Sequence, residues 1–245
     1  ARPPATGWVP GSYFEPPTEY YKNRRRTREI DEGDMKLSNE ERALRKRDQV
    51  FLDLMKTEEE FVTDLRHVID TYMAAVDDPS TPHSLRYLRD QLFLNFRDLY
   101  NFHANVLLKG LQYYSDDPGK VGQTFVRLER DFDHHVQYCN DQPSAEKLLD
   151  DPAVSEFFEK IQAQDSTYKD LRTYLQLPIE RLQQYHGYLK ELIKYTARAQ
   201  YDTKSLQRAL ELMISIPQRA NDLTYIRNLQ QYPGDTGKLG RLLRH

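Results

Sequence analysis

The sequence is poor in the residues that build covalent frameworks and phosphate-binding loops. It has a single cysteine, Cys139, so no internal disulfide can form. Only 10 of its residues are glycine, and no glycine-rich loop of the Walker or dinucleotide-binding type is present. We therefore expect a chain that holds no nucleotide itself and needs no cofactor.

Long apolar runs and a strong net charge are also lacking. No run is long enough to span a bilayer, and no segment resembles a signal peptide. The formal net charge is -3 at pH 7, so the chain as a whole does not attract nucleic acid or anionic lipid. We expect a cytoplasmic protein that does not insert into membranes and that binds partners through local surfaces.

The residues that are present suit long helices with one solvated face. Charged residues make up 30% of the chain and hydrophobic residues 38%. Apolar residues recur at helical spacing from about residue 40 to about residue 230, with breaks at 77–82 and 116–119. The predicted helices cover about 40–76, 84–114, 120–139, 144–162, 166–198 and 203–230. We therefore predict an all-α fold, an elongated bundle of about six long helices joined by short loops.

The two ends of the chain lack the helical period. Residues 1–17 carry proline, glycine and aromatic residues and read as a strand with turns. Residues 18–40 form a charged linker in which basic residues precede acidic ones. Ser38 and Glu41 have the spacing of a capping box, so we expect Ser38 to cap the first helix. The predicted divisions of the chain are 1–17, 18–40, a helical domain at 41–232, and a second linker with the start of a strand at 233–245.

Two predicted helices carry residues that do not fit a simple division into core and surface. Glu58 points about 40° from Leu54, inside the apolar stripe of the first helix. On the fifth helix Lys190 lies at the margin of the stripe, and Leu192 lies on the side that solvent can reach. A partly exposed edge of the stripe or a buried ion pair would explain the glutamate. A lysine whose stem covers apolar surface would explain Lys190.

The last two predicted helices each contain a proline, Pro178 and Pro217. An interior proline removes one intrahelical hydrogen bond, so we expect both helices to be kinked. The polar pair Asn221 and Asp222 follows the second proline. Local capping of the backbone is the ordinary explanation for such a pair.

Three residues near the middle of the chain have side chains that ligate metals. His134, His135 and Cys139 include a pair at i, i+4 that could bind zinc. No fourth ligand is evident, and packing in the core or at the surface is the ordinary explanation. No set of nucleophile, base and orienting residue is evident either, so nothing indicates a hydrolase or a transferase.

Three segments resemble the signature regions of Dbl homology (DH) domains, the helical exchange factors for Rho-family GTPases. They are VFLDLMKTEEEFVTDLRHVIDTY at 50–72, YLQLPIERLQQYHGYLKELIKYT at 174–196 and IPQRANDLTYI at 216–226. The RAND run is similar to that of the Trio, kalirin and obscurin branch, and the segments occur in family order. The resemblance covers about residues 42–232.

Both ends of the chain fit this resemblance. GWVPGSYFEPP, within 1–17, resembles the closing strand of an SH3 domain, and GKLGRLLRH, within 233–245, resembles the opening of a pleckstrin homology (PH) domain. An SH3 domain directly before a DH domain is similar to obscurin-type giant muscle proteins. The resemblance therefore implies association with the cytoskeleton or the sarcomere, with SH3 and PH domains as neighbours.

The resemblance implies a guanine nucleotide exchange factor, which accelerates GDP release from a Rho-family GTPase and is not an enzyme that makes or breaks covalent bonds. Glu58 would accept hydrogen bonds from the switch I segment of the GTPase. Lys190 would pair with acidic residues of switch II, and Asn221 would bond to the switch II backbone. Leu192 would press on an aromatic ring of the GTPase, and Arg181 would brace the site. The implied GTPase-binding residues are therefore Glu58, Lys190, Asn221, Asp222, Leu192 and Arg181.

The third signature region departs from the family pattern. Leu177 and Gln184 stand where the family has two lysines, and His186 stands in place of a proline. One alternative is therefore a non-catalytic helical scaffold of DH type that binds a GTPase or another protein without exchange. A second is a zinc-dependent hydrolase on a helical bundle.

Selectivity among GTPases rests on a few surface residues. Lys204 and Arg208 lie one helical turn apart and could favour a GTPase with acidic residues on its outer sheet. The resemblance links such a surface to RhoA-type partners. Lys204 and Arg208 could equally be solvated. We expect the domain to be a monomer.

Overall fold

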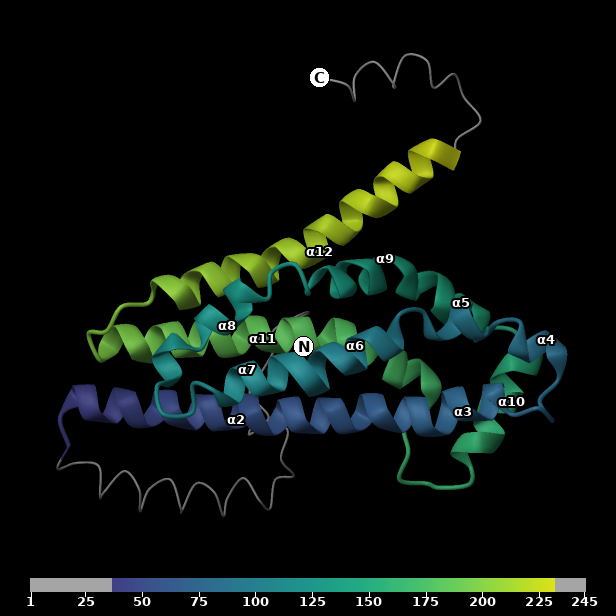
Figure 1. Ribbon diagram of the computed structural model, residues 1–245, viewed down its shortest axis with the longest axis horizontal. Helices are drawn as coiled ribbons and strands as arrows, with labels where there is room; N and C mark the ends of the chain where they lie inside the picture. Colours follow the sequence, from purple (N-terminus) through teal and green to yellow (C-terminus); the bar gives the residue numbers. More distant parts are fainter. Residues whose placement is uncertain (1–36, 232–245) are drawn as a thin grey trace, which may run out of the picture.

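The computed structural model describes residues 37–231, and all the regular structure in this range is helical (Figure 1). The prediction of an all-α fold is confirmed. The segments predicted to belong to SH3 and PH domains, 1–17 and 233–245, lie outside the described residues, as does most of the predicted linker at 18–40. Within residues 37–231, none of the helices is both long enough and apolar enough to cross a membrane.

Three long helices account for much of the fold, and shorter helical elements connect them. The elements in chain order are α2 (Asn39–His67), η2 (Val68–Met73), α3 (Ala74–Asp77), α4 (His83–Arg86), α5 (Arg89–Phe93), α6 (Phe96–Phe102), η3 (His103–Leu107), α7 (Leu108–Gln112), η4 (Pro118–Lys120), α8 (Gly122–Arg127), α9 (Asp133–Leu148), α10 (Pro152–Gln162), α11 (Leu171–Arg198) and α12 (Lys204–Gln231). The elements η2 and η3 are π-helical turns, and η4 is a turn of 3-10 helix.

Helix α11 is the central element of an elongated bundle. It packs against α2 and against α12, and these three helices run along the long axis of the molecule (Figure 1). Helices α8 and α9 pack against α12, while α6, η3 and α7 pack against α2. The short helices α4 and α10 lie together at one end of the bundle (Figure 1).

The start of α2 follows from its local sequence. The Ser38 hydroxyl accepts a hydrogen bond from the Glu41 backbone N–H, and the Glu41 carboxylate accepts one from the Ser38 backbone N–H, both at 3.1 Å. This reciprocal pair is the predicted capping box, which is therefore confirmed. It satisfies backbone donors that the start of a helix leaves without partners.

The prediction of one unbroken helix over 84–114 is wrong. The segment is divided into α4, α5, α6, η3 and α7. Leu94 ends α5 with a positive φ of 54°, and the side-chain amide of Asn95 donates to the backbone oxygen of His134 at 2.9 Å. A bond to a distant segment therefore accompanies the break, which helical periodicity alone does not reveal.

Two later boundaries also differ from the predicted ones. Helix α9 continues to Leu148 with Pro143 inside it, across the break expected near residue 140. Helix α11 begins at Leu171 because Asp170 caps it, accepting a hydrogen bond from the Thr173 backbone N–H at 2.7 Å. The predictions of single helices over 120–139 and 144–162 are also wrong. Turns at 128–132 separate α8 from α9, and α10 starts anew at Pro152, where Asp151 caps it.

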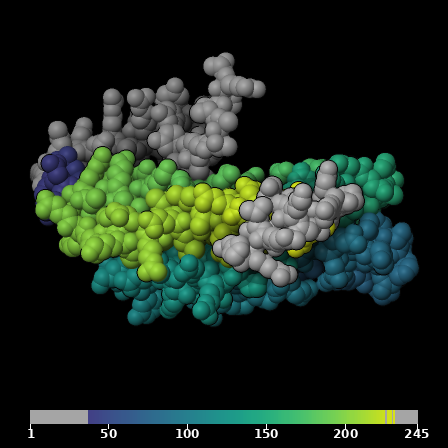
Figure 2. Space-filling view, turned by 90° about the horizontal axis from the view of Figure 1, so that it is seen from above, coloured from purple at the N-terminus to yellow at the C-terminus, as the bar shows by residue number. Residues whose placement is uncertain are grey.

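Both predicted interior prolines lie inside helices that continue past them, Pro178 in α11 and Pro217 in α12. Helix α12 changes direction near the middle of its length, and its C-terminal part diverges from α11 (Figure 1). Seen from above, α12 lies along the surface of the molecule (Figure 2). Among the residues of α12 whose side chains the structure describes, Ala220 is the last buried one. Beyond it, Thr224 and Arg227 bond to Asn140 and Asp141 of α9.

The apolar core consists of two clusters, and α2 and α11 contribute to both. Leu54 and Leu182 belong to the first cluster, which extends to α8 and α12. Phe61 and Leu175 belong to the second, which extends to α5 and α10. The boundary between the clusters therefore falls between residues 54 and 61 on α2 and between residues 175 and 182 on α11.

We predict that Gly122→Ala destabilises the fold, because α8 and α12 meet at Gly122 without room for a side chain. A Cβ atom there would lie 2.5 Å from the Ser205 backbone oxygen and 2.7 Å from the Leu206 backbone nitrogen. Overpacking against backbone should lower the free energy of unfolding by about 1–3 kcal/mol, measured by urea denaturation followed by circular dichroism.

Gly187→Ala is the matched control, because Gly187 is half-buried, lies within α11 and borders an open groove. That change should raise the free energy of unfolding by up to about 1 kcal/mol through helix propensity. An unchanged urea midpoint for Gly122→Ala would contradict the close approach of α8 and α12.

Candidate functional site

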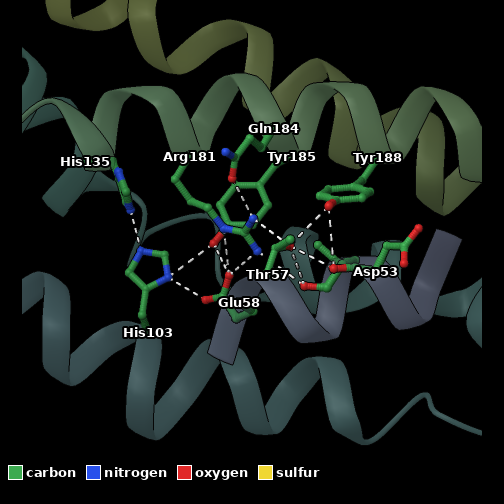
Figure 3. A network of polar contacts seen from close by, with 10 residues as sticks. Asp53, Thr57, Glu58, His103, His135, Arg181, Gln184, Tyr185 and Tyr188 are labelled. Carbon is green, nitrogen blue, oxygen red and sulfur yellow. Dashed lines mark hydrogen bonds and ion pairs between the residues drawn. The ribbon is translucent and has the colours of Figure 1, made fainter. Parts of the chain in front are cut away.

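Glu58 lies on the inner face of α2, and its side chain is completely buried. Its Oε2 accepts hydrogen bonds from Arg181 Nε at 3.1 Å, from Arg181 Nη2 at 2.8 Å and from the Tyr185 hydroxyl at 2.5 Å (Figure 3). Its Oε1 lies 2.7 Å from Nδ1 of His103. Both carboxylate oxygens are therefore engaged by groups of α11 and η3.

The buried pair of Glu58 and Arg181 is charged. Burial raises the pKa of Glu58, but the Arg181 guanidinium and the contacts with His103 and Tyr185 outweigh it and lower this pKa from its usual 4.5 to about 2. Burial lowers the pKa of Arg181, and the neighbouring Tyr185 and Glu58 oxygens raise it by more. The ion pair therefore persists at neutral pH and links α2 to α11.

Two histidines extend the network from Glu58 toward α9. Nε2 of His103 lies 2.7 Å from Nε2 of His135, and both side chains are completely buried (Figure 3). Nδ1 of His135 is buried and has no hydrogen-bond partner among the described residues. The arrangement that leaves no N–H unpaired has His103 donating from Nδ1 to Glu58 and His135 donating from Nε2 to His103.

The other end of the network approaches the surface between α2 and α11. Nη1 of Arg181 donates to the Thr57 hydroxyl at 2.9 Å and to the Gln184 side-chain oxygen at 2.8 Å. The Thr57 hydroxyl lies 3.2 Å from that of Tyr188. Asp53 lies one turn earlier on α2 and is half-buried. Its carboxylate accepts a hydrogen bond from the side-chain amide of Gln49 at 3.2 Å. Burial raises the pKa of Asp53.

The polar network occupies the boundary between the two apolar clusters. Glu58 lies between Leu54 and Phe61 on α2, and Arg181 lies beside Leu182 on α11. A buried charge that loses its partner is strongly unfavourable, whereas apolar side chains tolerate many neighbours. The network therefore fixes the register of α2 against α11 more strictly than the apolar contacts do.

The structure corrects the expectation that Glu58 lies on a surface that receives a partner. Glu58 and Leu192 are each 0% exposed, and Arg181 is 1% exposed. The carboxylate of Glu58 is turned inward because its hydrogen-bond partners lie inside the bundle. Leu192 also belongs to the first apolar cluster, so the prediction that solvent reaches it is wrong.

Lys190 and Asn221 line one groove, and both are exposed. The groove has a volume of about 560 Å³ and lies between α11 and α12, with Cys139 of α9 contributing to its wall. Its apolar lining includes Met213 and Ile214. Asp222 is exposed next to Asn221. The structure thus brings together two of the three polar residues that were expected to converge, and the third, Glu58, lies in the interior.

His103 and Tyr185 belong to the network, but the sequence did not single them out. The sequence does contain a pattern that indicates burial of His103. This residue lies four positions after Leu99 and four before Leu107, on one apolar stripe. A buried carboxylate on one helix requires a donor on another, so a polar residue on a second stripe is a candidate partner. His135, considered for zinc, donates to His103 instead. Within residues 37–231 no three metal-ligating side chains are gathered.

We predict that Glu58→Gln lowers the free energy of unfolding by about 3–5 kcal/mol, because it leaves the buried Arg181 guanidinium without an anion. Chemical denaturation gives this quantity. The double variant Glu58→Met, Arg181→Met should be more stable than Glu58→Gln, because it removes both charges.

Arg66→Ala is the matched control. It breaks the Arg66–Asp70 ion pair on the same helix, whose side chains are 69% and 62% exposed, and should cost less than about 1 kcal/mol. Equal losses for Glu58→Gln and Arg66→Ala would contradict the structural role of the buried pair.

We predict that the protein loses stability as the pH falls below about 6.5. Burial and the neighbouring His103 hold the pKa of His135 well below its ordinary 6.5, so the unfolded chain binds a proton that the folded chain does not. The free energy of unfolding should fall by up to about 1.4 kcal/mol per pH unit for this proton. The free energy of unfolding should fall further between pH 4.5 and about 2. In this range Glu58 is protonated in the unfolded chain but still ionised in the folded one.

Measuring the free energy of unfolding from pH 5 to pH 8 tests this dependence. His135→Gln keeps a side-chain N–H near the position of Nε2 but does not titrate. Its slope between pH 5 and pH 6.5 should be smaller than that of the unaltered chain by about one proton. Identical slopes would show that His135 does not remain neutral in the folded protein.

Comparison with known proteins identifies the family of this helical bundle. The RhoGEF domain model matches residues 50–221, a range that includes Glu58, Arg181, Lys190 and Asn221. The muscle M-line assembly protein unc-89 of Caenorhabditis elegans is 54% identical over 246 residues, an alignment that covers 100% of this chain and 3% of that protein. The human Rho guanine nucleotide exchange factor 25 is 31% identical over 234 residues, covering 96% of this chain and 39% of that protein.

Solved structures agree with the family match. A Vav1 exchange factor structure containing PH and C1 domains superposes with a TM-score of 0.64 at 25% identity, covering 77% of this chain and 54% of the other. The DH/PH domains of p115-RhoGEF superpose with a TM-score of 0.61 at 16% identity, which shows the shared fold. The chain spans less than half the length of the two sequence relatives. The resemblance to DH domains is confirmed, and the chain belongs to the RhoGEF domain family.

Proposed function

We propose that this domain accelerates GDP release from a Rho-family GTPase by stabilising the nucleotide-free state. The observation that carries the proposal is the RhoGEF match across residues 50–221, which contain the whole polar network and the groove. Relatives that are named as Rho guanine nucleotide exchange factors support it. The reaction changes non-covalent contacts only, so it needs no nucleophile and no cofactor.

The energetics of exchange require several contacts that act together. A nucleotide bound with nanomolar affinity is held by about 12 kcal/mol. Contacts that are equal in both states of the GTPase shift nothing, so the domain must bind the empty form more tightly. One hydrogen bond to a charged group contributes roughly 1.5–3 kcal/mol. A groove that combines an apolar lining with separate polar groups meets this requirement better than a single residue.

The groove between α11 and α12 is the surface that we assign to the GTPase. Lys190 on one wall presents a cation for acidic residues of the partner, and Asn221 on the other presents an amide that can bond to backbone. Asp222 adds an exposed acceptor beside it. Met213 and Ile214 supply apolar area, and Ile214 is 42% exposed.

Glu58, Arg181 and Leu192 take an indirect role in this proposal. Their burial prevents contact with a partner in the present conformation, so they hold α2 and α11 in register beneath the surface. Asp53 then becomes the acidic residue of α2 that can accept bonds from a GTPase near the network. Its side chain is half-buried, and it accepts a hydrogen bond from Gln49, a neighbour on the same helix.

A basic concavity at the start of α12 is consistent with an acidic partner. Lys204, Arg208 and Arg127 are among the residues that line it, and none of the three forms an ion pair within the described range. This surface supports the proposal of a RhoA-type GTPase with acidic residues on its outer face. The name of the unc-89 relative further supports a place in the muscle M-line for the protein that contains this domain.

A non-catalytic scaffold is the alternative that a specific observation favours. Gln184 stands where the family pattern has a lysine, and its side-chain oxygen accepts from Arg181. Leu177 stands at the other lysine position of the pattern, so α11 offers two cations fewer to an acidic partner. A scaffold would bind the GTPase with unchanged nucleotide release, so the exchange rate separates the two functions.

We predict that Lys190→Ala and Asn221→Ala each slow release of fluorescent GDP from a Rho-family GTPase by about tenfold or more, because each removes one strong contact. Both side chains are exposed, so the urea midpoint should not change. Lys147→Ala, an exposed lysine on α9 outside the groove, is the control. Rates equal to that of Lys147→Ala would remove the groove from the GTPase site.

The same assay separates the roles of Asp53 and Glu58. Asp53→Asn should slow exchange about tenfold without lowering the urea midpoint by a comparable amount. Glu58→Gln should lower the midpoint, and its folded fraction should keep most of the exchange rate. Slow exchange by the folded fraction of Glu58→Gln, with an unchanged rate for Asp53→Asn, would show that Glu58 contacts the GTPase directly.

A further inference from the structure

A second concavity lies at the end of the bundle where α2 begins and α11 ends. Its described lining residues are Asn39, Arg42, Ala43, Lys46, Tyr195 and Arg198, and its volume is about 410 Å³. It shares no lining residue with the groove between α11 and α12. The role assigned to that groove therefore does not account for it.

Positive groups surround one aromatic ring in this concavity. The Tyr195 ring centroid lies 5.8 Å from Lys46 Nζ, 5.7 Å from Arg198 Cζ and 4.9 Å from Lys194 Nζ. Lys46 and Arg198 are exposed and form no ion pair with any described acid, and Lys194 meets Glu191 only at 3.9 Å. The charges gather here although the chain as a whole is slightly acidic.

Arg42 adds an unsatisfied donor to the same lining. Its Nη2 donates to the Leu37 backbone oxygen at 3.3 Å, but its Nε is buried and has no hydrogen-bond partner among the described residues. Arg42 and Lys46 lie four positions apart on α2. Like charges at this spacing destabilise a helix. A buried donor without a partner and unpaired like charges both cost stability. An anion in the concavity would offset the repulsion between these like charges.

We propose that this concavity binds a ligand that carries phosphate groups. Its volume suits a small polar molecule, guanidinium and ammonium groups match phosphate oxygens, and Tyr195 provides a flat base. The acids nearest in sequence do not neutralise it. Glu41 is engaged by Ser38 in the capping box, and Asp48 pairs with Arg47, which is not among the described lining residues. The ligand could be a free phosphorylated molecule or the headgroup of a membrane lipid.

Calorimetric titration of the full chain with inositol hexakisphosphate tests the proposal. We expect binding that weakens as salt is raised, and that falls about tenfold or more in Lys46→Glu and in Arg198→Glu. Lys204→Glu is the matched control, because Lys204 lines the other basic concavity, which has no aromatic ring among its described lining residues. Circular dichroism checks that each variant is folded.

Sedimentation with lipid vesicles identifies the source of the phosphate. Vesicles with phosphatidylinositol bisphosphate should bind the chain through Lys46 if the ligand is a lipid headgroup, whereas vesicles of equal charge made with phosphatidylserine should bind less. Binding of soluble inositol hexakisphosphate alone would assign a free ligand. The proposal is overturned if neither probe binds, or if Lys204→Glu weakens binding as much as Lys46→Glu.

Discussion

The ion pair between Glu58 and Arg181 is the interaction on which the rest of the structure depends. It crosses from α2 to α11 at the boundary of two apolar clusters, with both side chains out of contact with water. Apolar packing alone would allow these helices to shift along one another at modest cost, whereas a shift that separated two buried charges would cost several kcal/mol. The pair therefore specifies one register for the central helices, and the surfaces of α11 are placed by it.

Because of this constraint, the residues that position the helices differ from the residues that can contact a partner. His103, Tyr185 and Thr57 bond to the pair, so its two charged groups are held inside the bundle even though the network reaches toward the surface at Gln184 (Figure 3). The groups available to a partner lie outside it, on the walls of the groove and at the edge of α2. A domain that must bind two states of a GTPase differently benefits from a rigid support beneath an adaptable surface.

Much of the fold could be predicted from the sequence because the helices are amphipathic and locally signalled. The capping box at Ser38 and Glu41 is confirmed, and so are the order and approximate extent of the three long helices α2, α11 and α12. The breaks within 84–114 could not be predicted, because the one at Asn95 accompanies a bond to a residue that is distant in sequence. Helical spacing correctly places Glu58 on the apolar stripe of α2. Spacing alone does not distinguish a carboxylate that faces the core from one that contacts a partner.

The central claim is that Glu58 stays inside the bundle while the domain acts on its partner. A crystal structure of the domain bound to a nucleotide-free Rho-family GTPase tests it most directly. The account predicts that Glu58 remains within hydrogen-bond distance of Arg181 and His103, with no atom of the GTPase in contact with its carboxylate. A Glu58 side chain turned outward and bonded to the switch I segment of the GTPase would contradict it.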